Sequence, residues 1–319
     1  MLFCSSQFVV FFAAVFALYW VTPWARARVW VLLAASFYFY ASWNKWLALI
    51  IFVSTTLDYF LARAIAAATS PRGRKALVAV SVVANLGLLC YFKYANFFLD
   101  SLGQALRAAG AEVSLPVLSV LLPIGISFYT FEAINYVVDV YRGHVKPETN
   151  LANFLLFILF FPHLVAGPIV RARDFLPQVR RRKHFNWHRA QVGAQLFLLG
   201  LIKKLVIADR MAMYADPVFA NPAAYGTVAV WVAMLAYAAQ IYGDFSGYSD
   251  MALGTAHLLG YHLAPNFDMP YLARNVAEFW RRWHISLSSW LRDYLFIPLG
   301  GSRGGGWLTA RNLLLTMTL

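Results

Sequence analysis

Long apolar runs alternate with short basic or polar segments along most of the chain. A helix that crosses a membrane needs roughly 20 predominantly apolar residues, and several runs approach that length. The pattern therefore predicts an all-α, polytopic transmembrane protein. We expect spans at about residues 7–23, 29–43, 46–63, 76–99, 117–140, 190–208 and 228–245, followed by an apolar run at 307–319 that reaches the last residue of the sequence.

The apolar run 151–170 differs from the others because Pro162 and the Gly167–Pro168 pair interrupt a helix. If this run crossed the membrane, the most basic segment, 171–189, would lie outside, against the tendency of Lys and Arg to remain on the cytoplasmic side. We therefore expect 151–170 to be re-entrant, dipping into the membrane and returning to the cytoplasmic face. A kinked complete span is the alternative.

If the N-terminus lies outside, each complete span moves the chain to the opposite side of the membrane, and this assigns a side to the remaining segments. Residues 100–114 and 209–226 become external links, and 246–306 become cytoplasmic. Within that last part, residues 246–260 are too short to span, so we expect a second, partly buried helix there that is separate from the span at 228–245.

Composition supports a membrane protein and changes how the basic residues are interpreted. Hydrophobic residues make up 61% of the chain and charged residues only 13%, with a mean hydropathy of +0.59. Soluble proteins carry roughly 25% charged residues, so a soluble globular fold is excluded. The net charge of +13 gathers between the apolar runs, which is typical of cytoplasmic loops that face anionic lipid. We expect membrane lipid as a partner and no nucleic acid.

The segment Trp280–Tyr294, RRWHISLSSWLRDY with the tryptophan before it, carries the first candidate chemistry. Projected on a helix, its tryptophans and leucines share one face, which predicts an interfacial amphipathic helix. His284 lies on the border of the apolar stripe, where an imidazole could face a buried cavity. Arg281 lies beside it and could hold an anionic ligand. The alternative is a border histidine with no chemical role.

The segment 242–254, YGDFSGYSDMALG, carries the second candidate site. Asp244 and Asp250 follow an apolar span, and carboxylates at such depth are costly and usually have a partner or a function. Ser246 and Tyr248 could supply hydrogen bonds. The alternative is a helix-end cluster in which Asp244 or Ser246 caps the next helix.

Two further charged features have structural alternatives. Glu132 and Asp139 are seven residues apart on the predicted span 117–140 and share a face, so they could line a tunnel or pair with arginines. The alternative, a polar contact between helices, is favoured. The basic segment 171–189 could attract an anionic donor or an acidic carrier protein, or it could only orient the chain against anionic lipid. Cys4 and Cys90 form no metal-binding motif, and we expect no metal site.

Three stretches together resemble the membrane-bound O-acyltransferases: FFPHLVAGPIVR, QIYGDFSGYSDMALG and NVAEFWRRWHISLSSWLRDYLFIPLGG. The likeness extends over essentially the whole chain and is strongest to the bacterial branch that O-acetylates alginate and other exopolysaccharides. It implies a multi-pass protein of the bacterial inner membrane with re-entrant and interfacial helices around a central funnel. It also implies transfer of an acyl group from a cytoplasmic donor, acetyl-CoA in this branch, without a bound cofactor. The implied partners are a periplasmic acetyltransferase and a polysaccharide acceptor.

The resemblance assigns one site histidine and leaves another unassigned. Family sites rest on two histidines, of which the first lies in the RWHIS motif and is His284 here. The second lies in a WHG motif on a later membrane helix, and this sequence contains no WHG. We therefore expect residues 1–319 to form a single membrane-embedded domain that is incomplete at its C-terminus. Asp293 is expected to pair with a local arginine. The alternatives are D-alanyl transfer to teichoic acid and a catalytically inactive membrane scaffold.

Overall fold

The computed structural model describes residues 1–110, 116, 118, 123 and 125–318, and every regular element within them is a helix. The first half of the chain contains α1 (Ser6–Val21), α2 (Ala25–Ala41), α3 (Lys45–Ala67), α4 (Pro71–Leu89), a π-helical segment η1 (Cys90–Tyr94), α5 (Ala95–Ala108), α6 (Ile126–Tyr141), α7 (Leu151–Leu159) and α8 (Phe161–Leu164). The second half contains α9 (Ala172–Arg180), α10 (Trp187–Ile202), the π-helical η2 (Lys203–Ala208), α11 (Asp209–Ala220), η3 (Pro222–Ala224), α12 (Thr227–Leu258), η4 (Pro270–Leu272), α13 (Val276–Arg282), α14 (Ile285–Leu291), η5 (Arg292–Phe296) and α15 (Gly305–Thr318).

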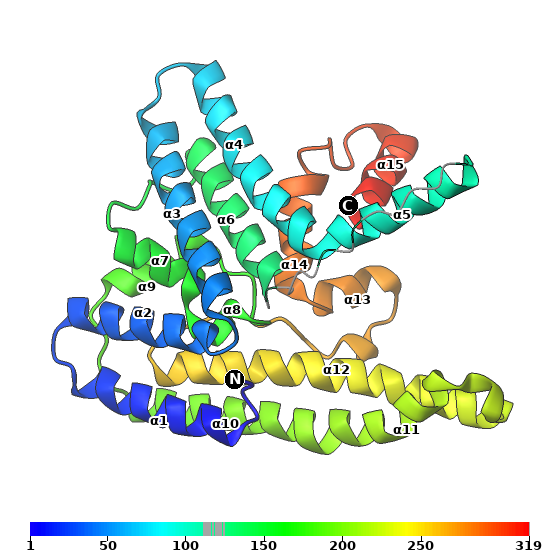
Figure 1. The fold of residues 1–319 in the computed structure, drawn as a ribbon. Helices are drawn as coiled ribbons and strands as arrows, with labels where there is room; N and C mark the ends of the chain where they lie inside the picture. The colour runs from blue at the N-terminus through cyan, green and yellow to red at the C-terminus, as the bar shows by residue number, and fades with distance from the viewer. Residues whose placement is uncertain (111–115, 117, 119–122, 124, 319) are drawn as a thin grey trace.

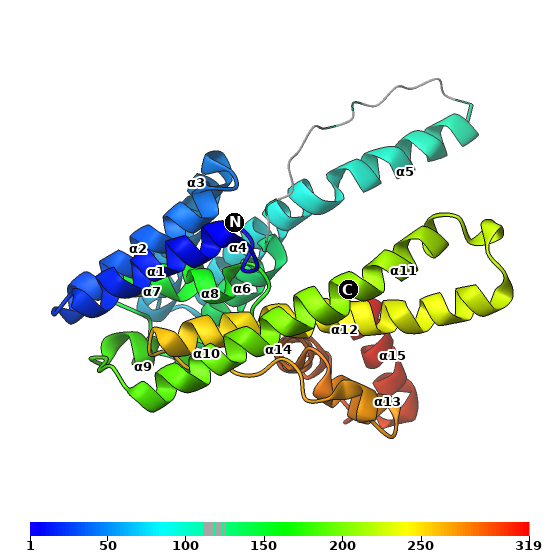
Figure 2. The same cartoon turned by 90° about the horizontal axis from the view of Figure 1, so that it is seen from below.

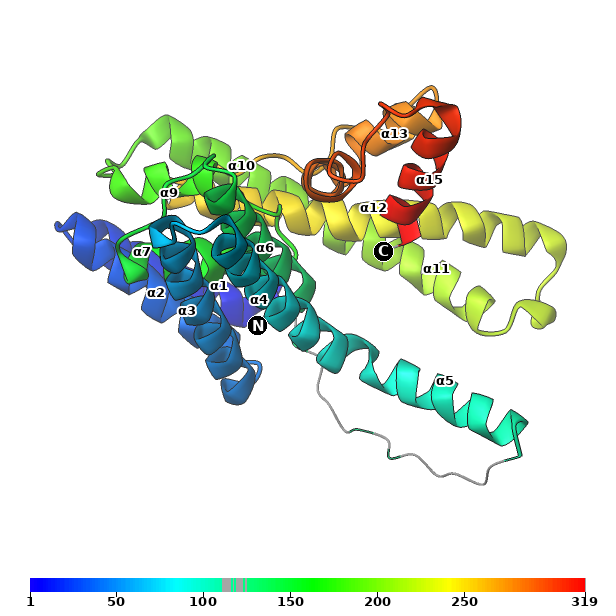
Figure 3. The same cartoon turned by 90° about the horizontal axis from the view of Figure 1, so that it is seen from above.

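Two groups of helices build the fold. The helices α3, α4 and α6 pack against one another as an inclined group (Figure 1). Below them in the same view, α12 runs along α10 and α11 as a long antiparallel pair. Seen from below, α5 projects away from the main body (Figure 2), and α11 and the start of α12 project together on the same side of the view. From above, α13 and α15 project over the same part of the view as α12 (Figure 3), whereas in Figure 1 α13 lies between α12 and α15.

Four helices are long and apolar enough to cross a membrane, judged by length and composition: Lys45–Ala67, Pro71–Ala108, Trp187–Ala220 and Thr227–Leu258. They contain the predicted spans 46–63, 76–99, 190–208 and 228–245, so the all-α, multi-pass prediction is confirmed. The predicted spans 7–23 and 29–43 are the shorter helices α1 and α2. Part of the predicted span 117–140 lies outside the described residues, and its described part is α6.

Two helices extend beyond the predicted spans, and one predicted helix boundary is wrong. Residues 100–108 continue the helix that begins at Pro71, and residues 209–220 continue the helix that begins at Trp187. The predicted separate helix at 246–260 is wrong, because α12 runs without a break from Thr227 to Leu258. Residues 246–260 are too short to span by themselves, which had suggested a separate helix there. In the structure, the glycines at 243, 247 and 254 let the neighbouring helix approach α12 closely.

The contact between α10 and α12 depends on those glycines. A Cβ on Gly254 would lie 2.5 Å from the carbonyl oxygen of Gly193, and one on Gly200 would lie 2.7 Å from the backbone nitrogen of Met251. Real side chains do not tolerate such distances. Small residues at matching heights therefore allow two backbones to touch, as is common between helices in membranes.

The run 151–170 is not one continuous helix, as its prolines predicted. α7 ends at Leu159, Phe160 leaves the helical conformation with ψ of 106°, and α8 adds four residues. These side chains are among the most buried in the protein, including Phe154, Phe157 and Phe161. Irregular backbone at membrane depth is tolerated where protein surrounds it. The side of the membrane to which this segment returns stays a prediction.

Candidate functional site

The predicted single amphipathic helix at Trp280–Tyr294 is wrong, because the chain breaks its helix at Trp283 and His284. α13 ends at Arg282 and α14 begins at Ile285, while His284 adopts the left-handed conformation with φ of 42° and ψ of 55°. The backbone here pairs with another segment instead of continuing the helix. Asp268 N–H donates to the carbonyl of Arg282 (3.0 Å), and Ile285 N–H donates to that of Asn266 (2.9 Å).

His284 lies inside the protein rather than along an exposed border. Its residue exposure is 9%, and its ring contacts Phe245 of α12 at 4.7 Å and Phe128 of α6 at 6.1 Å between centroids. Its Nε2 is buried and has no hydrogen-bond partner among the described residues. Burial lowers the pKa of His284 to about 4, so the imidazole is neutral at pH 7 and one of its ring nitrogens can accept a hydrogen bond.

Asn266 and Ser286 hold His284 in its unusual conformation. The Asn266 side chain accepts a hydrogen bond from Ser286 N–H (3.3 Å) and donates one to Ser249 Oγ on α12 (3.3 Å). Ser286 Oγ in turn accepts from Ile169 N–H (3.0 Å). A left-handed non-glycine residue persists only where its surroundings hold it, and such residues cluster at functional sites. Neither Asn266 nor Ser286 carried a recognisable sequence signal.

The segment around Gly167–Pro168 connects the histidine region to α6. Glu132 Oε1 accepts from Val170 N–H (2.8 Å) and lies 3.3 Å from His163 Nδ1 of α8. Asn135 Nδ2 donates to the carbonyl of Val170 (3.2 Å). Glu132 therefore makes a contact between segments, as the structural alternative predicted.

Asp139 also makes a structural contact. One of its carboxylate oxygens accepts from the Tyr294 hydroxyl (2.8 Å), and the other lies 3.6 Å from His144 Nδ1. Among the described ion pairs, neither Glu132 nor Asp139 contacts an arginine. The alternative of polar contacts between elements is confirmed for both.

Asp244 and Asp250 have lysine partners that the sequence analysis missed. Lys203 Nζ lies 2.6 Å from Asp250 and Lys204 Nζ lies 2.5 Å from Asp244. Both lysines are in the π-helical segment η2, whose wider turn directs two consecutive side chains to α12. A lysine pair inside an apolar run, LIKKLVI, was the available signal, since charged residues within spans usually pair with one another.

The other predicted site residues are scattered around α12 and α14. Ser246 is fully buried, and its hydroxyl has no partner among the residues described. Tyr248 stacks on Phe3, close to the N-terminus, with 4.7 Å between the ring centroids. Arg281 is exposed, and no ion pair involving it occurs in the described part of the chain.

Asp293 pairs with arginine, as predicted. It contacts the neighbouring Arg292 at 2.8 Å and Arg171 at 2.7 Å. Partial burial alone would raise the pKa of Asp293, but hydrogen bonds from these two arginines lower it below its ordinary value. The contact with Arg171 ties the basic segment 171–189 to η5. Within the described part of the chain, Asp293 makes its ion pairs with these arginines and not with His284.

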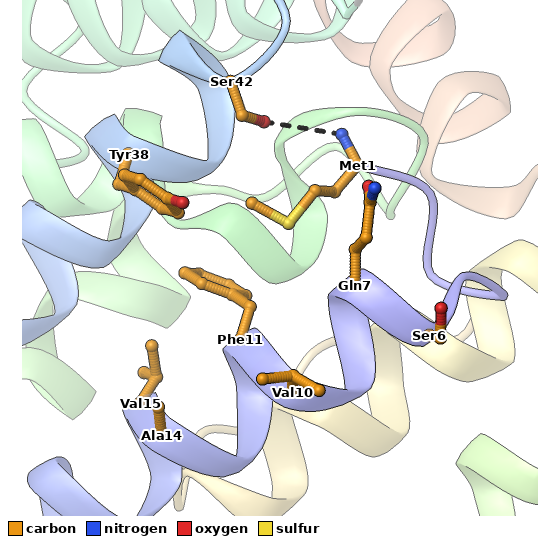
Figure 4. A pocket seen from close by; sticks show the side chains of 9 residues that line it. All are labelled: Met1, Ser6, Gln7, Val10, Phe11, Ala14, Val15, Tyr38 and Ser42. Atoms are coloured by element: carbon orange, nitrogen blue, oxygen red, sulfur yellow. Dashed lines mark hydrogen bonds between the residues drawn. The ribbon is translucent and has the colours of Figure 1, made fainter.

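The site region is distinct from a large hollow near the N-terminus. That hollow has a volume of about 790 Å³ and lies between α1 and the end of α2, with Phe11 and Tyr38 among its walls (Figure 4). The N-terminal amine lies 3.5 Å from Ser42 Oγ at its rim. None of the predicted site residues lines this hollow, and the central funnel implied by the resemblance stays a prediction.

Acid should destabilise the protein through His284. An unfolded histidine has a pKa near 6.5 and folded His284 about 4, so between these values the unfolded state binds more protons. The contribution of His284 to the free energy of unfolding is fully present above pH 6.5. It falls by about 3 kcal/mol in total as the pH decreases towards 4. His284→Gln should therefore lose less thermal stability between pH 7 and 4.5 in detergent micelles than the wild type. Equal losses would contradict the buried neutral state.

Asn266→Ala should loosen the turn that holds His284. The change leaves the buried N–H of Ser286 without its acceptor, which costs about 1–3 kcal/mol. Asn266→Asp keeps that acceptor but places a carboxylate at a buried position with no described cation beside it, so it should lose at least as much. Thermal unfolding in detergent measures both variants, with Asn221→Ala as a control at an exposed asparagine. If Asn266→Ala unfolds at the temperature of the control, the hydrogen bonds to Asn266 do not hold this turn.

Comparison with known proteins places this geometry in a family. The sequence model of the MBOAT, membrane-bound O-acyltransferase family matches residues 82–319. The "Probable alginate O-acetylase AlgI" of Pseudomonas syringae pv. tomato is 47% identical over 325 aligned residues, which cover 100% of this chain and 61% of that protein. The "Peptidoglycan O-acetyltransferase" of Helicobacter pylori is 37% identical, over 92% of this chain and 59% of its own length.

A more distant relative is the "Teichoic acid D-alanyltransferase" of Bacillus subtilis, which is 30% identical over 54% of this chain and 45% of its own length. The chain spans about 61% of the length of the Pseudomonas syringae relative that it matches. The resemblance inferred from the three motif stretches is confirmed. Since the family model covers well over half of the sequence and four helices are suited to cross a membrane, the chain belongs to the membrane-bound O-acyltransferase family and is a multi-pass membrane protein.

Proposed function

We propose that this protein is a membrane O-acyltransferase of the bacterial inner membrane. It takes an acetyl group from a cytoplasmic donor, acetyl-CoA, and passes it across the membrane to a periplasmic acetyltransferase that modifies an exopolysaccharide such as alginate. The observation that carries the proposal is the buried, unpartnered Nε2 of His284 in the RWHIS motif. The names of the Pseudomonas syringae and Helicobacter pylori relatives support O-acetylation.

The geometry suits His284 to the role of general base. Its neutral imidazole accepts the proton of an acceptor hydroxyl at Nε2, and the hydroxyl oxygen then attacks the thioester carbonyl carbon. The carbon–sulfur bond breaks, and the leaving thiolate takes up the proton. The left-handed turn between α13 and α14 directs the histidine inward between α6 and α12. The family's second histidine, which the WHG motif supplies, has no counterpart in residues 1–319.

Radiolabel transfer tests the proposal. The complete natural gene product is reconstituted in liposomes and supplied with acetyl-labelled acetyl-CoA on the face that carries the basic segment 171–189. We expect release of free CoA and appearance of label on an acceptor at the opposite face. D-Alanyl carrier protein as the only productive donor would favour D-alanyl transfer to teichoic acid. If neither donor is consumed above background, the proposal is wrong and the inactive scaffold is favoured.

A further inference from the structure

The end of α12 lies near the turn between α1 and α2, towards the left of Figure 1, and three basic side chains lie close together there. We call Arg28, Lys183 and Arg189 the cationic corner. Arg28 lies over the rings of Tyr19 and Trp20, at 5.2 and 5.1 Å from their centroids. Lys183 Nζ lies 4.4 Å over the ring of Tyr261. A Cβ on Gly260 would lie 3.2 Å from Arg189 Nη2, which places that guanidinium against the end of α12.

The cationic corner holds no counter-charge in the described part of the chain. Arg28 donates to the backbone carbonyls of Thr22 (2.7 Å) and Lys183 (2.8 Å), and Arg189 donates to that of His184 (2.6 Å). Every acidic side chain with a described ion pair contacts some other basic residue. Like charges held together without a counter-charge are unfavourable.

Lys183 shows the cost of that arrangement most clearly. Burial first, and then the charges of Arg189 and Arg181, lower the pKa of Lys183 to about 8. Its ammonium group touches an aromatic face and has no described hydrogen-bond acceptor. By contrast, the neighbouring Arg182 is exposed to solvent. A basic segment that only keeps its loop on the cytoplasmic side needs exposed charges such as that of Arg182. That role does not explain why Lys183 and Arg189 are partly buried.

An apolar groove leads away from the cationic corner. It has a volume of about 370 Å³ and is lined almost wholly by carbon, from α1 (Phe8, Val9, Phe12, Ala13, Phe16), α10 (Ala194, Phe197, Leu198) and Leu258. Trp20 Nε1 donates to the carbonyl of Leu258 (3.2 Å), so the end of the groove adjoins the rings under Arg28. From Phe8 to Phe16 the helix rises about 12 Å, which accommodates much of one acyl chain.

We propose that this surface is a specific binding site for one anionic phospholipid. The phosphate group lies at the cationic corner, where Arg189 and Lys183 contact it, and one acyl chain lies in the groove between α1 and α10. Arginine suits a phosphate by its fork of donors and lysine by its point charge. The joint presence of unpaired cations and an adjoining apolar groove selects a lipid over a soluble phosphate, because a soluble ion would not use the groove.

The test compares lipids on the purified, delipidated protein in neutral detergent. Phosphatidylglycerol, added to saturation, should raise the melting temperature by about 5 °C, and phosphatidylcholine should not. The double variant K183Q/R189Q should lose this shift. The control R26Q/R182Q makes the same charge change at two exposed arginines and should keep it. Ala194→Trp fills the groove without touching the cations and should also weaken the shift.

Other outcomes overturn the proposal. An equal shift with phosphatidylcholine means that the headgroup charge is not recognised. A full shift with inorganic pyrophosphate at matched ionic strength, unaffected by Ala194→Trp, means that the corner binds a soluble phosphate. If K183Q/R189Q fails to fold, Ala194→Trp and the control still decide the matter. Without anion, K183Q alone should melt higher than the wild type, because it removes an uncompensated charge; a lower melting temperature marks Lys183 as purely structural.

Discussion

His284→Ala in the complete natural gene product should lower acetyl transfer by about 100- to 10,000-fold, the usual contribution of a general base. The effect should fall on turnover rather than on the KM for donor, because the imidazole acts on the proton that moves in the transition state. The assay is label transfer from acetyl-CoA in proteoliposomes. His284→Gln should be similarly impaired, since an amide cannot accept the proton.

His188→Ala is the matched control. That histidine is exposed at the start of α10, so its loss should leave turnover unchanged. Thermal unfolding at pH 7 separates chemistry from folding, because the neutral, unpartnered ring of His284 contributes packing but no hydrogen bond from Nε2. Normal turnover in a folded His284→Ala protein would remove this residue from the mechanism.

Gly200→Ala should destabilise the protein by about 1–3 kcal/mol, the cost of overpacking a closely fitted contact. The new methyl group would overlap the carbonyl oxygen of Gly247 and lie 2.8 Å from Met251 Cγ. α10 and α12 would have to separate, and the ion pairs Lys203–Asp250 and Lys204–Asp244 lie just beyond this contact. Thermal unfolding in detergent micelles measures the change.

Gly87→Ala is the matched control for the same substitution. Gly87 lies in α4, is exposed, and has no atom within 4 Å of the position that a Cβ would occupy. Alanine there should stabilise the helix by about 0.5–1 kcal/mol, since glycine costs that much inside a helix. The same substitution in two helices should therefore change the stability in opposite directions. If both stabilise, the close approach of α10 and α12 is not what these glycines provide.

The long helix α12 shows why the sequence analysis divided one helix into two. Residues 246–260 were interpreted as a separate helix because they are too short to span a membrane by themselves. The structure instead shows one helix, in which the glycines at 243, 247 and 254 lie against Ala208, Gly200 and Gly193 of the neighbouring helix. The hydrophobic pattern of one segment cannot distinguish a helix break from a close contact, because the contact partners are about 35 to 60 residues away in the chain.

The sequence alone determined the class of the protein, the main spans and the irregular character of 151–170. These depend on hydrophobic length and on proline chemistry, which act locally. It also identified His284 and its family through a long motif, and it anticipated the arginine pairing of Asp293.

Only the tertiary structure determined the backbone conformation of His284 and the direction of its side chain. Helical projection predicted a continuous surface helix, because periodicity reports which side chains would share a face if the helix continued. The pairing of residues 282–285 with 266–268 replaced helical hydrogen bonds with long-range ones and turned the imidazole inward. The lysine partners of Asp244 and Asp250 and the hydrogen bonds of Asn266 likewise join distant segments. Such contacts depend on the packing of whole helices, which no local pattern encodes.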